Sequence, residues 1–270
     1  MSGPRARRQR INGPGPNAPR KVMPGDINLK RDLISLSVLT LAAFGILAGL
    51  GIWQLQRLEW KQGLSARIEA RTVAQPVTLT DALNNWEKSG DVEYLRVSLR
   101  GSFRHDRESH YFTVINGKTG WRVITPLDTS GGHIVLVDRG FVPAAKKQPQ
   151  TRTQGQLEGE QTVIGLARSP GVKGTFSPEN SLEKNNWFWR DLNGMAAAAL
   201  PAGDVTRVAP FFVEQEVSSI PGGWPRGGVT RVKLSNRHLQ YAFTWFGLAA
   251  ALLGVFALHL RSRLRERPFT

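Results

Sequence analysis

Two short segments of the sequence combine residue types that can bind an iron porphyrin. One is GIWQLQRLEWK at residues 51–61, and the other is NRHLQYAFTWF at residues 236–246. A histidine imidazole is a standard axial ligand of heme iron, aromatic rings cover a porphyrin face, and arginine pairs with propionate carboxylates. The candidate cofactor-binding residues are therefore His238, which would also be the ligand of the heme iron, Arg57, Trp53, Gln54, Tyr241 and Trp245.

Helical spacing would place these residue types together. Trp53 and Arg57 are four residues apart, and Tyr241 and Trp245 follow His238 by three and seven residues, so each set shares one face of a helix. The sequence leaves two plainer explanations open. Tryptophan and tyrosine with nearby Lys and Arg are the ordinary anchors of membrane-spanning helices, and a neutral histidine at an interface can donate to a backbone carbonyl without binding a ligand.

Each segment borders a long block without formal charge, at residues 33–53 and 239–260 if His259 is neutral. At about 1.5 Å per residue, each block is long enough to cross the roughly 30 Å hydrocarbon core of a bilayer. The alternative for the first block is a cleaved signal peptide. However, the block exceeds the usual ~7–15 apolar residues of such a peptide, and no small-x-small cleavage site precedes the polar stretch. The sequence predicts two transmembrane helices, one near each end.

The formal net charge of +15 is concentrated in two tails. Residues 1–32 are predicted to form a disordered basic arm rich in Pro and Gly, and residues 261–270 form a basic tail; together they supply nine of the fifteen charges. Lys and Arg beside membrane spans mark the cytoplasmic side, so both termini are expected to be cytoplasmic. This distribution favours membrane lipid as a partner and argues against nucleic acid.

Residues 54–238, between the two spans, are predicted to form one extramembrane α+β domain that is mainly antiparallel β. Asn116-Gly117 predicts a hairpin turn after the strand-like run 111–115. Two helices are expected, at 80–88 with Thr80 as the cap and at 192–200 with Asp191 as the cap and Pro201 as the stop. Apolar alternation or β-branched content predicts further strands at 94–103, 121–127, 133–142, 162–167 and 211–217.

No residue set typical of an enzyme is present, so we expect that the protein is not an enzyme. There is no cysteine, which excludes thiol nucleophiles and thiolate metal sites. The sequence also lacks HExxH and GxSxG motifs, and Gly117-Lys118-Thr119 lacks the earlier glycine that a phosphate-binding loop requires. Acidic pairs such as Asp106 with Glu108 lie in polar, loop-like surroundings that favour solvated charges, and the histidines of this region are expected on the surface or in strands.

Five segments, in order along the chain, resemble the surfeit locus protein 1 family, membrane proteins that assist assembly of cytochrome c oxidase. One departure is Phe141, where the family often has tryptophan, and the basic arm of residues 1–32 lies outside the resemblance. The segments are GIWQLQRLEWK at 51–61, GWRVITPL at 120–127, VLVDRGFVP at 135–143, FSPEN at 176–180 leading to NWFWRD at 186–191, and NRHLQYAFTWF at 236–246.

The resemblance implies an assembly factor for a heme-copper cytochrome c oxidase that assists binding or insertion of heme a in subunit I. In the family, a histidine at the start of the second helix is implicated in heme binding, and it corresponds to His238. The implied cofactor is heme a, bound transiently. The implied partners are cytochrome c oxidase subunit I and the heme a synthesis machinery.

Two other functions remain open. A cofactor-free membrane scaffold would use the aromatic motifs only to hold helices of subunit I during assembly. A membrane-anchored enzyme on the outer side is disfavoured by the missing catalytic residues. The expected location is the bacterial cell inner membrane, with the mitochondrial inner membrane as the alternative, although the serine-poor arm does not resemble a transit peptide.

Overall fold

The computed structural model describes residues 24–229 and 236–265, with side chains from residue 31 onward. The chain divides into two compact units. The helical unit comprises Met1–Trp60 with Asn236–Thr270, and the barrel domain comprises Lys61–Ser235. Most of the predicted disordered arm, up to residue 23, and the end of the predicted basic tail, beyond residue 265, lie outside the described residues.

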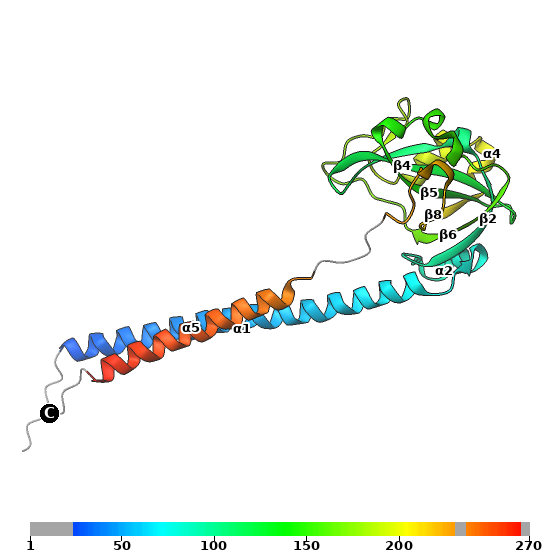
Figure 1. Ribbon diagram of the computed structural model, residues 1–270. Helices are drawn as coiled ribbons and strands as arrows, with labels where there is room; N and C mark the ends of the chain where they lie inside the picture. The colour runs from blue at the N-terminus through cyan, green and yellow to red at the C-terminus, as the bar shows by residue number, and fades with distance from the viewer. Residues whose placement is uncertain (1–23, 230–235, 266–270) are drawn as a thin grey trace, which may run out of the picture. The chain divides into compact units, whose positions relative to one another are not determined.

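Two helices, α1 (Pro24–Val73) and α5 (His238–Arg265), run side by side in the helical unit (Figure 1). Both are long and apolar enough to cross a membrane, judged by length and composition. They extend beyond the predicted spans. α1 begins inside the predicted arm at Pro24, a residue that suits a first helical turn. It continues well past Trp53 because the following segment is rich in good helix formers and meets no proline before Pro76.

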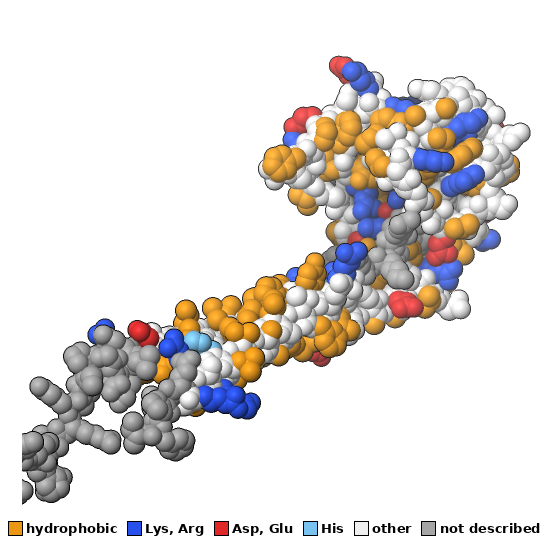
Figure 2. Space-filling model, turned by 60° about the vertical axis from the view of Figure 1, so that its left-hand side comes forward, with side chains coloured by type: hydrophobic (Ala, Val, Ile, Leu, Met, Phe, Trp, Pro, Cys, Tyr) orange, Lys and Arg blue, Asp and Glu red, His pale blue; other side chains and the backbone are white. Residues whose placement is uncertain are grey.

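Small side chains line the contact between α1 and α5. Gly51 is buried on α1, and Ala242 and Ala249 are buried on α5. A Cβ atom at Gly51 would lie 2.6 Å from the ring of Phe246, so this ring packs directly on the glycine backbone. Small residues let helix backbones approach closely in membrane helix pairs. Away from this contact, apolar side chains cover the exposed surface of the helices (Figure 2), as lipid surroundings would favour.

Five strands of the barrel domain close into a barrel. The order is β2, β6, β8, β5 and β4, and pairing of β4 with β2 closes the ring. All these pairings are antiparallel except that of β5 with β8, which is parallel. The strands are β2 (Arg96–Phe103), β4 (Lys118–Thr129), β5 (Ile134–Pro143), β6 (Glu160–Arg168) and β8 (Val208–Gln215).

Three more strands extend this sheet. β3 (Ser109–Ile115) pairs with β4, β7 (Asn186–Trp187) adds a parallel edge to β3, and β1 (Val77–Thr78) adds one to β2. The connections contain short helices: α2 (Leu79–Ser89), α3 (Leu192–Ala199), α4 (Ala202–Val205), η1 (His105–Arg107), η2 (Ala144–Lys146), η3 (Pro149–Gly155) and η4 (Pro221–Gly223).

The domain has two apolar clusters. One includes Val97, Leu127 and Phe211 from the barrel strands, with Ala82 of α2 packed against it. The other joins Trp187 to α3 through Met195 and to the outer side of β5 and β8. Burial of these large side chains stabilises the fold by about 1.5–3 kcal/mol each. Through these two clusters, α2 and α3 pack against the strands of the sheet.

The local predictions were largely confirmed. All five predicted strands and the hairpin at Asn116-Gly117 are present, with positive φ angles of 52° and 75° at the turn. Asp191 caps α3 by accepting from the N–H of Gly194. Thr80 as the cap of α2 was wrong: Thr78 is the cap, because it forms a reciprocal capping box with Asp81.

Candidate functional site

His238 is the first residue of α5. Its backbone N–H donates to Oδ1 of Asn236 at 3.2 Å, so the asparagine two residues earlier fixes the start of the helix. This contact holds the imidazole at one end of α5. The position agrees with the sequence prediction, which placed His238 at the border of the apolar block.

The side chain of His238 makes a hydrogen bond to Gln54 on α1. Nδ1 of the imidazole lies 2.7 Å from Oε1 of Gln54, and Gln54 is 9% exposed. An amide oxygen only accepts hydrogen bonds, so Nδ1 carries the hydrogen and donates it. In a neutral imidazole Nε2 then keeps its lone pair. This geometry prepares Nε2 to bind a metal ion or accept a proton.

The other candidate residues lie on or near the same helix ends. The guanidinium carbon of Arg57 lies 4.3 Å from the ring centroid of Trp60, one turn further along α1, in a cation–π contact. Trp53 and Tyr241 are 51% and 52% exposed, and Trp245 is half-buried. Among the described residues, no hydrogen bond, ion pair or ring contact joins these four candidates to His238.

The helix face that meets α5 therefore differs from the aromatic face emphasised by the sequence motif. Gly51 and Gln54 are buried, three residues apart, whereas Trp53 and Arg57 are exposed. The sequence analysis included Gln54 only as a member of the motif and did not anticipate its bond to His238. The sequence did contain one signal for this bond: Gln54 is a polar residue that follows Gly51 by three positions, so both lie on the same, otherwise apolar helix face.

His259 lies near the opposite end of α5, 21 residues after His238, which corresponds to roughly 30 Å along a helix. It borders a cavity of about 380 Å³ together with Asp32 of α1 and Arg263 of α5. Among the described residues, no group of three or more His, Asp or Glu side chains could hold a metal ion. A single histidine is nevertheless a residue type that can serve as a protein ligand of a heme iron, which needs no cluster of protein ligands.

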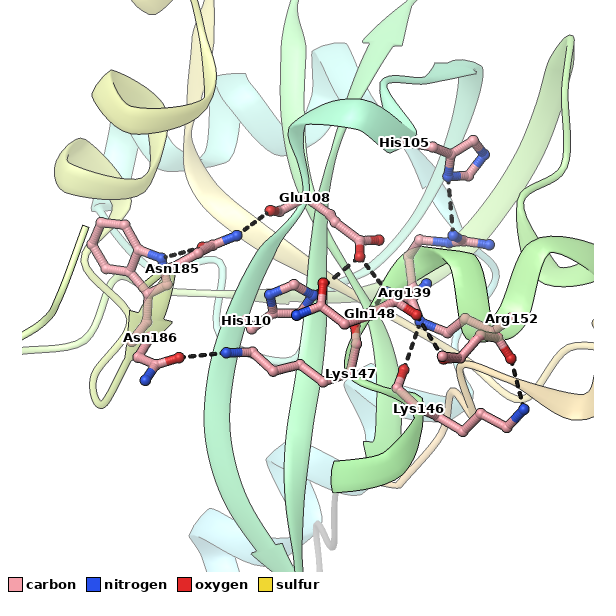
Figure 3. A network of polar contacts seen from close by, with 12 residues as sticks. His105, Glu108, His110, Arg139, Lys146, Lys147, Gln148, Arg152, Asn185 and Asn186 are labelled. Atoms are coloured by element: carbon pink, nitrogen blue, oxygen red, sulfur yellow. Dashed lines mark hydrogen bonds and ion pairs between the residues drawn. The ribbon is translucent and has the colours of Figure 1, made fainter. Parts of the chain in front are cut away.

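The barrel domain contains a buried polar cluster that the sequence did not reveal (Figure 3). Glu108 is buried and accepts hydrogen bonds from His110 Nε2 at 3.0 Å and from Arg152. The expectation that Glu108 is a solvated loop charge was therefore wrong. Arg139 lies beside this cluster, with His105 accepting from it at 3.2 Å. His105, Glu108 and His110 lie close together in and around η1 and β3, but Arg139 of β5 and Arg152 of η3 are distant from them in sequence, so no local motif marked the whole cluster.

A second ionic cluster contains three motif residues of the family resemblance. Arg122 pairs with Asp138, and Arg168 and Arg190 pair with Glu214. Burial raises the pKa of Asp138, while the Arg122 guanidinium opposes that effect. Glu93 also accepts from Arg168, so three arginines face three carboxylates. This balance points to a structural role for the cluster inside the barrel domain.

Comparisons with known proteins agree with this architecture. The model of the SURF1 family matches residues 41–250. Surfeit locus protein 1 of Homo sapiens is 40% identical over 222 residues, which cover 75% of this chain and 70% of the human protein. Surfeit locus protein 1 of Takifugu rubripes is 39% identical, with 75% and 88% covered, and a SURF1-like protein of Monosiga brevicollis is 34% identical, with 82% and 87% covered. The family match includes the whole barrel domain, α1 from residue 41 onward and α5 up to residue 250, so the chain belongs to the SURF1 family.

Proposed function

We propose that this protein is an assembly factor for a heme-copper cytochrome c oxidase, and that it binds heme a through His238 on behalf of subunit I. The observation that carries the proposal is the hydrogen bond between His238 and Gln54, because it leaves Nε2 of a fixed imidazole as a free lone pair. Membership of the SURF1 family supports the oxidase role that the sequence resemblance implies.

Heme a supplies an iron that accepts an axial nitrogen, a flat apolar face and two propionates. In the proposed site, His238 would donate the Nε2 lone pair to the iron, and Gln54 would hold the ring in the Nδ1–H tautomer. Trp53, Tyr241 and Trp245 would cover the apolar face. The guanidinium carbon of Arg57 lies over the ring of Trp60, and the N–H groups of Arg57 would pair with a propionate.

The same proposal places the protein in the bacterial cell inner membrane, with the mitochondrial inner membrane as the alternative. Both termini would be cytoplasmic, and the barrel domain would lie on the other side of the membrane. The Lys/Arg excess of the two tails and the two apolar helices support this topology. The partners would be oxidase subunit I, surrounding lipid and the heme a synthesis machinery.

A cofactor-free scaffold is the second candidate. The half-exposed rings of Trp53 and Tyr241 favour it, because aromatic side chains at one end of a helix pair can pack against helices of subunit I without a cofactor. In that case, the bond between Gln54 and His238 would serve only to join α1 to α5.

One purification separates these two functions. The full-length protein would be purified in detergent from cells that synthesise heme a, and both its absorbance and its bound subunit I would be measured. The proposal predicts a Soret band with a fixed heme stoichiometry. A colourless protein that still binds subunit I would support the scaffold and overturn heme binding.

A further inference from the structure

A polar pocket of about 300 Å³ lies between η3 and η4 of the barrel domain. Its lining includes Lys146 and Arg152 but no acidic residue. Hydroxyl, amide and aromatic groups complete the wall, from Thr151, Thr153, Gln154 and Trp224. The lining thus carries two cations and several hydrogen-bonding groups but no carboxylate of its own, although Arg152 also pairs with Glu108, which is not a lining residue.

Arg152 is turned inward at this pocket. The backbone of η3 leaves the helical conformation at this residue, with φ −147° and ψ 40°, and the side chain is only 1% exposed. Nε donates to the carbonyl of Lys146 at 3.0 Å, and Nη2 donates to Glu108 and to the carbonyl of Lys147. Nη1 is buried without a hydrogen-bond partner. Arg152 therefore supplies a fixed, buried positive charge beside the pocket.

A second guanidinium lies behind the pocket wall. Arg139 donates from Nη2 to the carbonyl of Gly155, a lining residue, at 2.6 Å. Its other neighbours are the neutral ring of Phe103 at 4.7 Å and the imidazole of His105. Burial, together with the charge of Arg152, lowers the pKa of Arg139 to about 10. Arg139 stays protonated at neutral pH, yet no carboxylate among the described residues pairs with it directly.

The buried charges at this pocket do not balance. Among the described residues, Glu108 is paired with Arg152 but makes no direct contact with the nearby guanidinium of Arg139 (Figure 3), and Lys146 adds a third cation in the pocket lining. The second ionic cluster of the same domain, around Arg122 and Glu214, pairs three arginines with three carboxylates. An uncompensated buried charge is costly, so the local excess of positive charge favours an anion from outside the chain.

We propose that this pocket binds a small oxyanion of the phosphate class. A phosphate monoester carries a charge of about −1.5 to −2 at pH 7, free phosphate is a mixture of mono- and dianion, and both accept several hydrogen bonds. Lys146 would reach it directly, because Nζ donates to the carbonyl of Thr151 at 2.6 Å and has further N–H groups. Thr153 would donate its hydroxyl, which makes no hydrogen bond to any described residue. The volume is at the lower end for ligand pockets, which suits free phosphate or a small phosphate ester.

The test is equilibrium dialysis of radiolabelled inorganic phosphate against the full-length protein in detergent at low salt. We expect one saturable site. Thr153→Asp places a carboxylate in the pocket and should weaken binding at least tenfold, and Lys146→Gln should weaken it by about tenfold. Lys118→Gln, at the exposed end of the β3–β4 hairpin, is the matched control and should bind phosphate as the wild type does.

Thermal unfolding without phosphate shows whether each variant folds. Competition with glycerol 3-phosphate distinguishes the source of the anion: tighter binding than inorganic phosphate would identify a phosphate ester, and weaker binding would identify free phosphate. Absence of saturable binding at millimolar phosphate would overturn the proposal. So would wild-type affinity in folded Thr153→Asp.

Discussion

Nδ1 of His238 lies 2.7 Å from Oε1 of Gln54, across 184 positions of sequence. The bond joins the start of α5 to the middle of α1, where Gln54 is buried. A buried amide without a partner would cost about 1–3 kcal/mol, so the bond stabilises the helix pair and also fixes the imidazole. The same two residues therefore stabilise the helix pair and orient the candidate ligand.

Gln54→Leu should release the imidazole of His238 while keeping an apolar fit. We expect the Nδ1–H tautomer in the wild type and a mixture of tautomers in the variant, because the Gln54 oxygen that accepts from Nδ1 is lost. Heme retention should fall by about 10–100-fold, the usual effect of losing a group that orients a ligand. The measurement is ¹⁵N NMR of the labelled imidazole, followed by heme titration.

Gln56→Leu is the control for this experiment, since Gln56 is exposed on the same helix. Equal tautomer ratios in wild type and Gln54→Leu would show that the bond does not hold in solution. A changed tautomer ratio with unchanged heme retention would support the Gln54–His238 bond in the wild type but would show that Gln54 plays no part in heme binding.

Gly51→Leu should separate α1 from α5. A Cβ at this position would lie 2.6 Å from the ring of Phe246, whereas nothing lies within 4 Å of a Cβ at Gly49. Overpacking of this kind destabilises by about 1–3 kcal/mol. Spin labels on the two helices should report a larger separation in Gly51→Leu than in Gly49→Leu. Identical separations in the two variants would show that the glycine contact does not set the helix distance.

The topology can be tested with a reporter that is active only outside the cytoplasm. Fusion after Gly171, in a loop of the barrel domain, should give activity, and fusion after Thr270 should give none. The reason is the Lys/Arg excess in the two chain tails that border the apolar blocks, because Lys and Arg beside a span mark its cytoplasmic side. Activity at Thr270 would contradict the two-span arrangement.

The stability of the barrel domain should fall in mild acid because of His105. Burial lowers the pKa of this imidazole, although its Nε2–H donates to the carbonyl of Leu157 at 2.9 Å. Protonation would remove the acceptor at Nδ1 for Arg139 and would place a cation beside Arg139 and Arg152; Glu108 opposes this only in part. The depressed pKa means that the unfolded chain binds the proton more readily, so stability is lost as pH falls below about 6.5.

The measurement compares unfolding midpoints at about pH 7.5 and pH 5.5 for wild type and His105→Gln. Glutamine can donate to Leu157 and accept from Arg139 without titrating. The wild type should lose more stability over this interval than the variant. The raised pKa of Asp138 affects both proteins equally, so equal losses would exclude His105 as the cause.

The sequence predicted the local elements because their signals are local. Alternating apolar residues marked β2, β4, β5, β6 and β8, and the Asn116-Gly117 turn fixed the register of the β3–β4 hairpin. Barrel closure left no such signal. It depends on Gly101, where a Cβ would lie 2.1 Å from the carbonyl of Asp128, so that β2 and β4 can approach closely at their ends. The parallel pairing of β5 with β8 likewise joins strands that are far apart in sequence.

The sequence supplied the residues of the candidate site but not the contacts between them. The resemblance and residue chemistry singled out His238, and the structure places it at the start of α5. The face of α1 that contacts α5 depends on how α1 is rotated about its own axis, and the sequence does not give that rotation. Gly51 sets that rotation through Phe246, and sequence spacing alone favoured the aromatic residues instead. The pairing of Glu108 with Arg152 was hidden for a similar reason, because 44 residues separate them.

The most direct test of the account compares His238→Ala with His259→Ala in protein purified from cells that synthesise heme a. His259 is a histidine of the same helix, roughly 30 Å away by helical rise, and it has no contact with Gln54. His238→Ala should abolish or shift the Soret band, and His259→Ala should keep the wild-type spectrum and heme stoichiometry. A wild-type spectrum and stoichiometry in His238→Ala would contradict the ligand assignment and favour the cofactor-free scaffold.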